Sequence, residues 1–394
     1  MGKVLKDNVF TAVKAAREAK EIHGDKVIDV TLGALYDEEG EMVAMDAVWD
    51  VYNNISNFQK AKYASSLQGN PEFQDAVRSW LGLPQAHVVA TPGGSGAVSV
   101  TLRNSLRYND TVLFPSVCWG PYKIMAVDQN IDFDYYEMFE GDHFNIASFK
   151  EKSTDLMDRQ GRLTVVINDP AHNPTGYSMS YDEWVEVMKF LNELAEKGRI
   201  ALLNDVAYID FAKDASKSKA HFHLFENLHK NLLVVTAFSL SKTLTAYGLR
   251  VGAAVIVGEQ SEDFKNECVH TARSIWSNVN NSGQVLFSEL VFDEEKRNRY
   301  LDEKEVYVKM LKERSDLFLK EAKEVGLEIY PHKEGFFATV KVDPSIRAKV
   351  HAKLNEELIF TIDLPNGPRV ALCSAPIRKV SGLAKKIKDV INLF

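Results

Sequence analysis

The sequence predicts an α/β protein with a large, doubly wound, mostly parallel sheet domain and a smaller α+β domain. Three observations lead to this prediction. The chain has 394 residues, enough for two or three folding units. Between about residues 85 and 258, short apolar segments alternate with amphipathic stretches, and a long charged helical stretch follows from about residue 285. We expect the large domain to span residues 45–288 and the small domain to combine residues 1–44 with 289–394.

Short apolar segments are the candidate strands of the large domain. Several are apolar on both faces, which is typical of parallel strands that helices cover on both sides. The segments are HVVAT (87–91), DTVLF (110–114), LTVVIND (163–169), IALLND (200–205), LLVVTAF (232–238) and VGAAVIV (251–257). Between them, YDEWVEVMKFLNELAEKG (181–198) has the pattern of an amphipathic helix, with acidic residues in its first turn and Gly198 as the expected stop.

The small domain is predicted from the two ends of the chain. Residues 292–326 have the pattern of a long charged helix, and residues 327–342 and a last helix pair suit an α+β unit. The N-terminal arm, residues 7–33, is too short to fold alone. We therefore expect it to pack on the small domain.

Composition excludes several classes of protein. The net charge of −8 makes nucleic acid or an anionic membrane an unexpected general partner. The cysteines Cys118, Cys268 and Cys373 are scattered without a CxxC pair, so neither a metal site nor a disulfide framework is predicted. The start lacks the apolar core of a signal peptide, and no apolar run approaches the ~20 residues of a membrane helix. We expect a cytoplasmic protein.

A lysine stands at the end of one candidate strand. Lys242, in FSLSKTLTAYGLRVG (238–252), has no acid in the immediate sequence, and the next positive charge is Arg250. Such a lysine either extends its amine to water from the strand end, or uses that amine chemically as a Schiff-base former. The neighbouring strand ends favour the second interpretation.

The other strand ends carry groups that suit a phosphorylated, aromatic cofactor. PGGSGAVSV (92–100) is a glycine turn before a helix, where free backbone N–H groups and the helix dipole attract phosphate, although such loops are more often only turns. Asp205 ends another strand, as a partner for a buried cationic nitrogen or as a helix N-cap. Asn173, in NDPAHNPTG (168–176), offers an amide donor or belongs to a plain turn, and Trp119 is an aromatic plate or a core residue. Together these groups fit pyridoxal phosphate bound through Lys242, with Asp205 on its ring nitrogen.

At this point the sequence resembles the fold-type I, class I/II aminotransferases of the aspartate and aromatic aminotransferase family over nearly the whole chain. SLSKTLTAYGLRVG is similar to the family's Schiff-base segment, HNPTG to its asparagine loop, NDVAY to its Asp-x-x-Tyr element and GGSGA to its phosphate loop. The resemblance implies a homodimer with shared active sites. It also implies that Lys242, Asp205 and Tyr208 are catalytic.

The resemblance implies roles for further residues. Those expected to bind the cofactor are Gly94, Ser95, Trp119, Asn173, Asp205, Tyr208, Ser239, Ser241, Lys242 and Arg250, with Tyr63 reaching the phosphate from the neighbouring subunit. Arg369 is expected to bind the substrate α-carboxylate, Gly33 to lie in a loop over the substrate, and Arg273 to bind a distal carboxylate across the dimer interface. Ser274 stands where the family usually has proline, and Gly93 where it usually has serine.

The implied function is transfer of an amino group from an L-amino acid, aspartate, glutamate or aromatic, to a 2-oxo acid such as 2-oxoglutarate. Two alternatives stay open at this point. A C–S β-lyase or related lyase of the same fold uses nearly the same residues, and would release pyruvate and ammonia from a cysteine-type substrate. A non-catalytic, cofactor-binding regulator belongs to a different class, and the acidic balance and missing helix-turn-helix segment argue against it.

Overall fold

The computed structural model describes residues 8–394, which divide into two compact units. The larger unit contains Ala44–Pro170 and Met179–Glu305, and the smaller contains the chain up to Val43, Ala171–Ser178 and Val306–Phe394. The larger unit therefore runs to residue 305, where the sequence analysis placed the boundary at 288. The short segment Ala171–Ser178, which was expected within the large domain, is grouped with the smaller unit.

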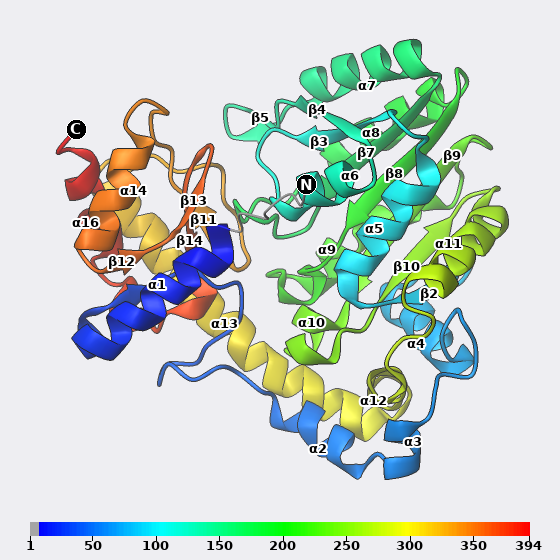
Figure 1. Cartoon of the computed structure of the whole chain (residues 1–394), viewed down its shortest axis with the longest axis horizontal. Coiled ribbons are helices and arrows are strands. Elements are labelled where there is room, and N and C mark those ends of the chain that lie inside the picture. The colour runs from blue at the N-terminus through cyan, green and yellow to red at the C-terminus, as the bar shows by residue number, and fades with distance from the viewer. Residues whose placement is uncertain (1–7) are drawn as a thin grey trace, which may run out of the picture. The chain divides into compact units, whose positions relative to one another are not determined.

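A seven-stranded sheet forms the centre of the larger unit, with the order β2-β10-β9-β8-β7-β3-β4 (Figure 1). All strands run parallel except β10, which is antiparallel to both neighbours. The strands are β2 (His87–Thr91), β3 (Thr111–Pro115), β4 (Asp132–Tyr136), β7 (Arg162–Asn168), β8 (Arg199–Asp205), β9 (Leu232–Ser239) and β10 (Gly252–Val257). All six predicted strands are present. Strand β4 was not predicted, because its sequence DFDYY has no apolar run.

Helices cover this sheet and complete the larger unit. On one face, α5, α6 and α11 share a hydrophobic core with the strands, and α7 packs on β7, β4 and β3 outside that core. The helices are α2 (Asp46–Asn54), α3 (Asn57–Ala61), α4 (Pro71–Leu81), α5 (Gly93–Ser105), α6 (Pro121–Asp128), α7 (Ile146–Gln160), α8 (Tyr181–Leu194), α9 (Ala215–Ser218), α10 (Leu240–Thr243), α11 (Ser261–Ile275) and α12 (Asn281–Phe292). Short elements are the pair β5 (Phe139–Glu140) and β6 (His143–Phe144) and the 3₁₀ turns η2 (Ile209–Phe211), η3 (Ala220–Phe225) and η4 (Tyr247–Leu249).

The expected helix of residues 181–198 is shorter than predicted. It begins with a capping box of Ser180 and Glu183, but ends at Leu194 rather than at Gly198. Gly198 serves close packing instead, because a Cβ there would lie 2.5 Å from the carbonyl oxygen of Gly161. The prediction was therefore correct for the first residue of the helix and wrong for its last residue.

The smaller unit is α+β. Its sheets are β11-β14-β13 and the parallel pair β1-β12. The strands are β1 (Ile28–Asp29), β11 (Phe337–Thr339), β12 (Ile359–Phe360), β13 (Ile362–Leu364) and β14 (Gly367–Ala371); the helices are α1 (Asn8–His23), α14 (Arg347–Glu356), α15 (Ile377–Val380) and α16 (Leu383–Ile391), with the 3₁₀ turns η1 (Gly24–Lys26) and η5 (Leu372–Ser374). The long charged helix α13 (Glu294–Glu324) contributes to both units.

The N-terminal arm packs on the smaller unit, as predicted. Ile28 of β1 pairs with Ile359 of β12, and both lie in the core of that unit. Among the described residues, no helix is long and apolar enough to cross a membrane.

Candidate active site

The carboxyl edge of the large sheet gathers most of the predicted site residues. The parallel strands β8 and β9 end there with Asp205 and Ser239, and the antiparallel β10 begins there with Gly252. Gly252 lies opposite both Thr91 at the end of β2 and Ser239. This edge is where open α/β sheets bind their ligands.

A cradle of donors forms around the start of α5. Gly93, with φ of 72°, approaches Arg250 so closely that a Cβ would lie 2.7 Å from a guanidinium nitrogen. A Cβ at Gly94 would lie 3.2 Å from the Cβ of Ser239. Arg250 donates to the hydroxyl of Ser241 at 2.9 Å. The predicted Gly94, Ser95, Ser239, Ser241 and Arg250 thus surround one helix N-terminus, a set of donors that suits a phosphate group.

Lys242 lies on α10, directly after the buried strand β9. Its Nζ is 4.5 Å from the ring centre of Tyr247 and 5.8 Å from that of Tyr208. The side chain is half-buried. The structure therefore places the amine near two tyrosine rings, and Tyr247 is a neighbour that was not predicted from the sequence.

Asp205 is buried, with 6% of its surface exposed. Tyr122 donates a 2.6 Å hydrogen bond to Oδ2, and the backbone N–H of Ala207 donates to Oδ1 at 3.1 Å. Burial raises the pKa of Asp205 above its ordinary value, although both hydrogen bonds act to lower it. A cationic ring nitrogen is the partner that would keep such a carboxylate charged.

Tyr122 is a site residue that the sequence analysis missed. Burial and then the charge of Asp205 raise the pKa of Tyr122 well above its ordinary value. The hydroxyl therefore stays protonated and acts as a hydrogen-bond donor to Asp205. The ring of Trp119 meets that of Tyr122 edge-on, with centroids 5.3 Å apart. The missed signal was the spacing in FPSVCWGPY, where a second aromatic residue follows Trp119 three positions later.

A second buried carboxylate, Asp210, binds α10 at the residue that follows Lys242. Thr243, the residue after the lysine, donates to Asp210 Oδ2 at 2.7 Å, and Trp80 donates to the same carboxylate at 3.1 Å. The ammonium of Lys304 lies 3.5 Å away, and both charged side chains are buried. Burial acts to raise the pKa of Asp210, but the charges of Lys304 and Lys219 outweigh it and hold the pKa below its ordinary value.

The smaller unit carries the predicted carboxylate-binding arginine. Arg369, on β14, donates to Asn173 Oδ1 at 3.1 Å and to the backbone oxygen of Thr31 at 2.8 Å. Its guanidinium lies over the ring of Phe337, 4.3 Å from the centroid. Gly33 lets the arm approach this ring, because a Cβ at that position would lie 2.7 Å from it. The structure thus brings together Arg369, Asn173 and Gly33, and adds Phe337.

Tyr63 and Arg273 form a third group on the larger unit. Tyr63 is 83% exposed, and Arg273, in the last turn of α11, is also exposed and donates to Ser277. The loops that follow them are joined, because Asn278 accepts a 2.9 Å hydrogen bond from the N–H of Ala64. The structure therefore places these two predicted residues on neighbouring exposed loops, in contrast to the buried groups at the carboxyl edge.

The family is evident from comparison with known proteins. The description "aminotransferase class I and II" applies to a family whose profile matches residues 25–375. The chain belongs to this family. A crystal structure of an aminotransferase from Anaerococcus prevotii is 34% identical and matches with a TM-score of 0.95 over 100% of this chain and 98% of that one. The aminotransferase fold predicted from the sequence is thereby confirmed.

More distant aminotransferases also match this chain. The aspartate aminotransferase of Salmonella typhi is 25% identical over 267 residues, 64% of this chain, and the match spans 65% of that relative's length. The aromatic-amino-acid aminotransferase of Paracoccus denitrificans is 27% identical over 57% of each chain. The aromatic-amino-acid aminotransferase of Burkholderia pseudomallei, a structure covalently bound to pyridoxal phosphate, shares the fold with a TM-score of 0.82 at 18% identity over 99% of this chain and 98% of that one.

Proposed function

We propose that this protein is a pyridoxal phosphate-dependent aminotransferase, which moves the amino group of an L-amino acid to a 2-oxo acid such as 2-oxoglutarate. The observation that carries the proposal is the carboxyl edge of one sheet. There, Lys242 directly follows Ser241, which accepts a hydrogen bond from Arg250 of the donor cradle, and Asp205 is buried with Tyr122 as its donor. Membership of the aminotransferase family supports this function over the lyase and the regulator.

The donor set fits the cofactor. Gly94, Ser95, Ser239, Ser241 and Arg250 would bind the phosphate, Lys242 would bind the aldehyde carbon, and Asp205 would hold the proton on the ring nitrogen. Asn173 and Tyr208 would donate to the ring oxygen, and Trp119 would stack on the ring. When bound, pyridoxal phosphate supplies an electron-accepting ring that stabilises negative charge at the substrate Cα.

The protein's own residues would then handle binding and proton movement. Arg369 binds the α-carboxylate of the substrate through its planar fork of N–H donors, and the loop of Gly33 excludes water. The amine of Lys242 would remove the Cα proton and would deliver it to the former aldehyde carbon of the cofactor, because a proton returned to Cα would transfer no amino group. The buried Asp205 would keep the ring nitrogen protonated, because a charged partner is strongly preferred where water is excluded.

The decisive experiment is covalent trapping. Purified protein loaded with pyridoxal phosphate should show visible absorption from the bound cofactor, and borohydride reduction followed by peptide mass spectrometry should find the label on Lys242. Lys242→Ala should lose both the absorption and turnover with 2-oxoglutarate, whereas Lys197→Ala, an exposed lysine paired with Asp158, should keep them. Near-normal turnover by Lys242→Ala, or a label on another lysine, would refute the proposal.

We propose aspartate and glutamate as donors on the basis of Arg273, with aromatic amino acids as the rival class. A single-turnover spectral screen of the twenty amino acids should rank the donors. Arg273→Gln should raise KM for aspartate and leave an aromatic donor unaffected. Release of pyruvate and ammonia from a cysteine-type substrate without an oxo acid would favour the lyase instead.

We also propose a homodimer with shared sites, in which Tyr63 and Arg273 serve the neighbouring subunit. Their exposure on joined loops supports this arrangement. Light scattering should give the dimer mass. Mixing inactive Lys242→Ala subunits with impaired Tyr63→Ala subunits should restore activity, because one site of each mixed dimer receives neither substitution. No recovery on mixing would argue for unshared sites. The cytoplasmic location stays a prediction.

A further inference from the structure

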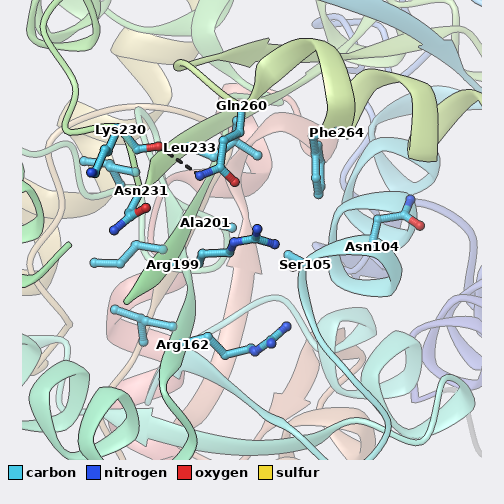
Figure 2. A pocket seen from close by; sticks show the side chains of 13 residues that line it. Asn104, Ser105, Arg162, Arg199, Ala201, Lys230, Asn231, Leu233, Gln260 and Phe264 are labelled. Atoms are coloured by element: carbon cyan, nitrogen blue, oxygen red, sulfur yellow. Dashed lines mark hydrogen bonds between the residues drawn. The ribbon is translucent and has the colours of Figure 1, made fainter. Parts of the chain in front are cut away.

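A second pocket lies at the opposite, amino-terminal edge of the same sheet. Its volume is about 90 Å³, and its walls come from the starts of β7 and β8, the residues that lead into β9, the end of α5 and the start of α11 (Figure 2). Arg162 and Arg199 are the first residues of β7 and β8, so the pocket is separated from Asp205 by the length of the strands. No part of the proposed aminotransferase site lines it.

The register of the sheet brings like charges together in this pocket. Arg162 and Arg199 are direct partners across β7 and β8. Neighbouring strands lie ~4.8 Å apart, and partners in register leave the sheet on the same face. Figure 2 shows the two guanidinium groups extending in the same direction, while Lys230 lines the pocket with its side-chain nitrogen on the other side of the view. Like charges so placed repel each other unless a counter-ion lies between them.

The protein supplies little negative charge here. The carboxylate of Asp110 lies 3.5 Å from Nε of Arg162, and this buried nitrogen has no hydrogen-bond partner among residues 8–394. Burial, then the charge of Arg107, lower the pKa of Arg162, and Arg199 acts in the same direction while Asp110 opposes them. The acidic Glu262 and Asp263 in the first turn of α11 do not line the pocket. A net positive charge is left.

The neutral polar side chains of the pocket already have partners. Gln260 donates to the backbone oxygen of Lys230 at 3.0 Å, and Asn231 donates to that of Ala195 at 3.0 Å. At the end of α5, Asn104 and Ser105 donate to carbonyl groups of their own helix. The charged groups left to contact a ligand are the guanidinium groups of Arg162 and Arg199, and Leu163 and Leu233 add apolar lining.

We propose that this pocket binds a small phosphate-class anion, either inorganic phosphate or the phosphate end of a phosphorylated metabolite. A volume of about 90 Å³ corresponds to roughly three water molecules, which suits one tetrahedral oxyanion. Two planar guanidinium groups provide bidentate donors for such an anion. The doubly charged anion removes the repulsion between Arg162 and Arg199.

The test uses protein loaded with pyridoxal phosphate, so that the cradle at α5 is filled. Inorganic phosphate is titrated by calorimetry at constant ionic strength, with chloride as the balancing anion. We expect saturable binding at one site. Arg199→Gln should weaken it at least fivefold and keeps the Arg162–Asp110 pair, so that folding is preserved. Arg17→Gln, an exposed arginine on α1 that does not line the pocket, is the matched control.

Three outcomes would overturn the proposal: no saturable phosphate binding above chloride, equal binding by the Arg199→Gln and Arg17→Gln variants, or loss of binding through Arg250→Gln, which would assign the phosphate to the cradle. Glycerol 2-phosphate separates the two sources of ligand. Binding tighter than that of inorganic phosphate would indicate a phosphorylated metabolite that also contacts Phe264, and equal binding would indicate inorganic phosphate. Failure of cofactor loading would count against the aminotransferase proposal alone.

Discussion

Tyr122 donates a 2.6 Å hydrogen bond to Asp205, and both residues are buried beneath the carboxyl edge of the sheet. Burial raises the pKa of Asp205, and this hydrogen bond acts in the opposite direction because it stabilises the charged carboxylate. Tyr122 therefore supports the group expected to hold the ring nitrogen proton of the cofactor.

Tyr122→Phe should weaken catalysis without removing the cofactor. Loss of the bond raises the pKa of Asp205 further, so the carboxylate competes more strongly for the proton and the ring nitrogen is protonated less fully. A hydrogen bond to a charged group contributes about 1.5–3 kcal/mol, so kcat/KM should fall by roughly 10- to 100-fold. Tyr136→Phe is the control, because its buried hydroxyl donates to the carbonyl of Val166 instead. Equal losses in the two variants would show that Asp205 does not depend on Tyr122.

Asp210→Asn should destabilise the larger unit strongly. The substitution leaves the ammonium of Lys304 buried without its partner carboxylate, and breaking such a buried pair costs about 3–5 kcal/mol. Urea unfolding should show this loss. Asp158→Asn removes an exposed pair with Lys197 and should cost under ~1 kcal/mol. A small effect at Asp210 would mean that water, not Lys304, compensates the carboxylate.

His221 should make stability depend on pH. It is buried, stacks on Trp184 at 4.3 Å, and burial lowers its pKa from 6.5 to about 3. Because the folded-state pKa lies below the unfolded value, the unfolded chain binds more protons below pH 6.5. Stability is therefore complete above pH 6.5 and falls as the pH drops toward 3, by ~1.4 kcal/mol per pH unit.

The variant His221→Phe tests whether His221 causes this dependence of the free energy of unfolding on pH. The free energy of unfolding is measured at pH 6, 5 and 4.5. Between these values it should fall less steeply in the variant than in the unchanged protein, and the two slopes should differ by ~1.4 kcal/mol per pH unit. Part of the slope should remain, since burial lowers the pKa of His332 to about 4. Phe225→Leu, which changes the same aromatic cluster without removing a titratable group, should leave the slope unchanged. An unaltered slope in His221→Phe would contradict the assignment.

Gly33→Ala should affect substrate binding through Phe337. The added Cβ would lie 2.7 Å from the ring, so the ring must move from its place against Arg369. We expect KM for the amino acid to rise by about tenfold, as for one lost hydrogen bond, with a smaller change in kcat. Gly120→Ala, where nothing lies within 4 Å of the new Cβ, is the control. Unchanged KM would show that the ring yields without disturbing Arg369.

Local features of the sequence predicted much of this protein. Apolar runs, glycine turns and strand-end residues depend on neighbours in the chain, so they predicted the six strands, the start of α8 and the family. They also predicted that Lys242, Asp205 and the phosphate loop lie at one edge, because parallel strands bring their carboxyl ends together. The polar sequence of β4 and the close packing at Gly198 carried no comparable local signal.

Only the tertiary structure decided which side chains meet. Tyr122 and Asp205 are 83 residues apart, and Thr243 and Asp210 are 33 apart. The pairing of Arg162 with Arg199 depends on the register of β7 and β8. These contacts follow from strand order and packing, which no periodicity in one segment encodes. The sequence thus determined the elements and the chemical groups at their ends, while burial and register determined the partners of those groups and hence their charge.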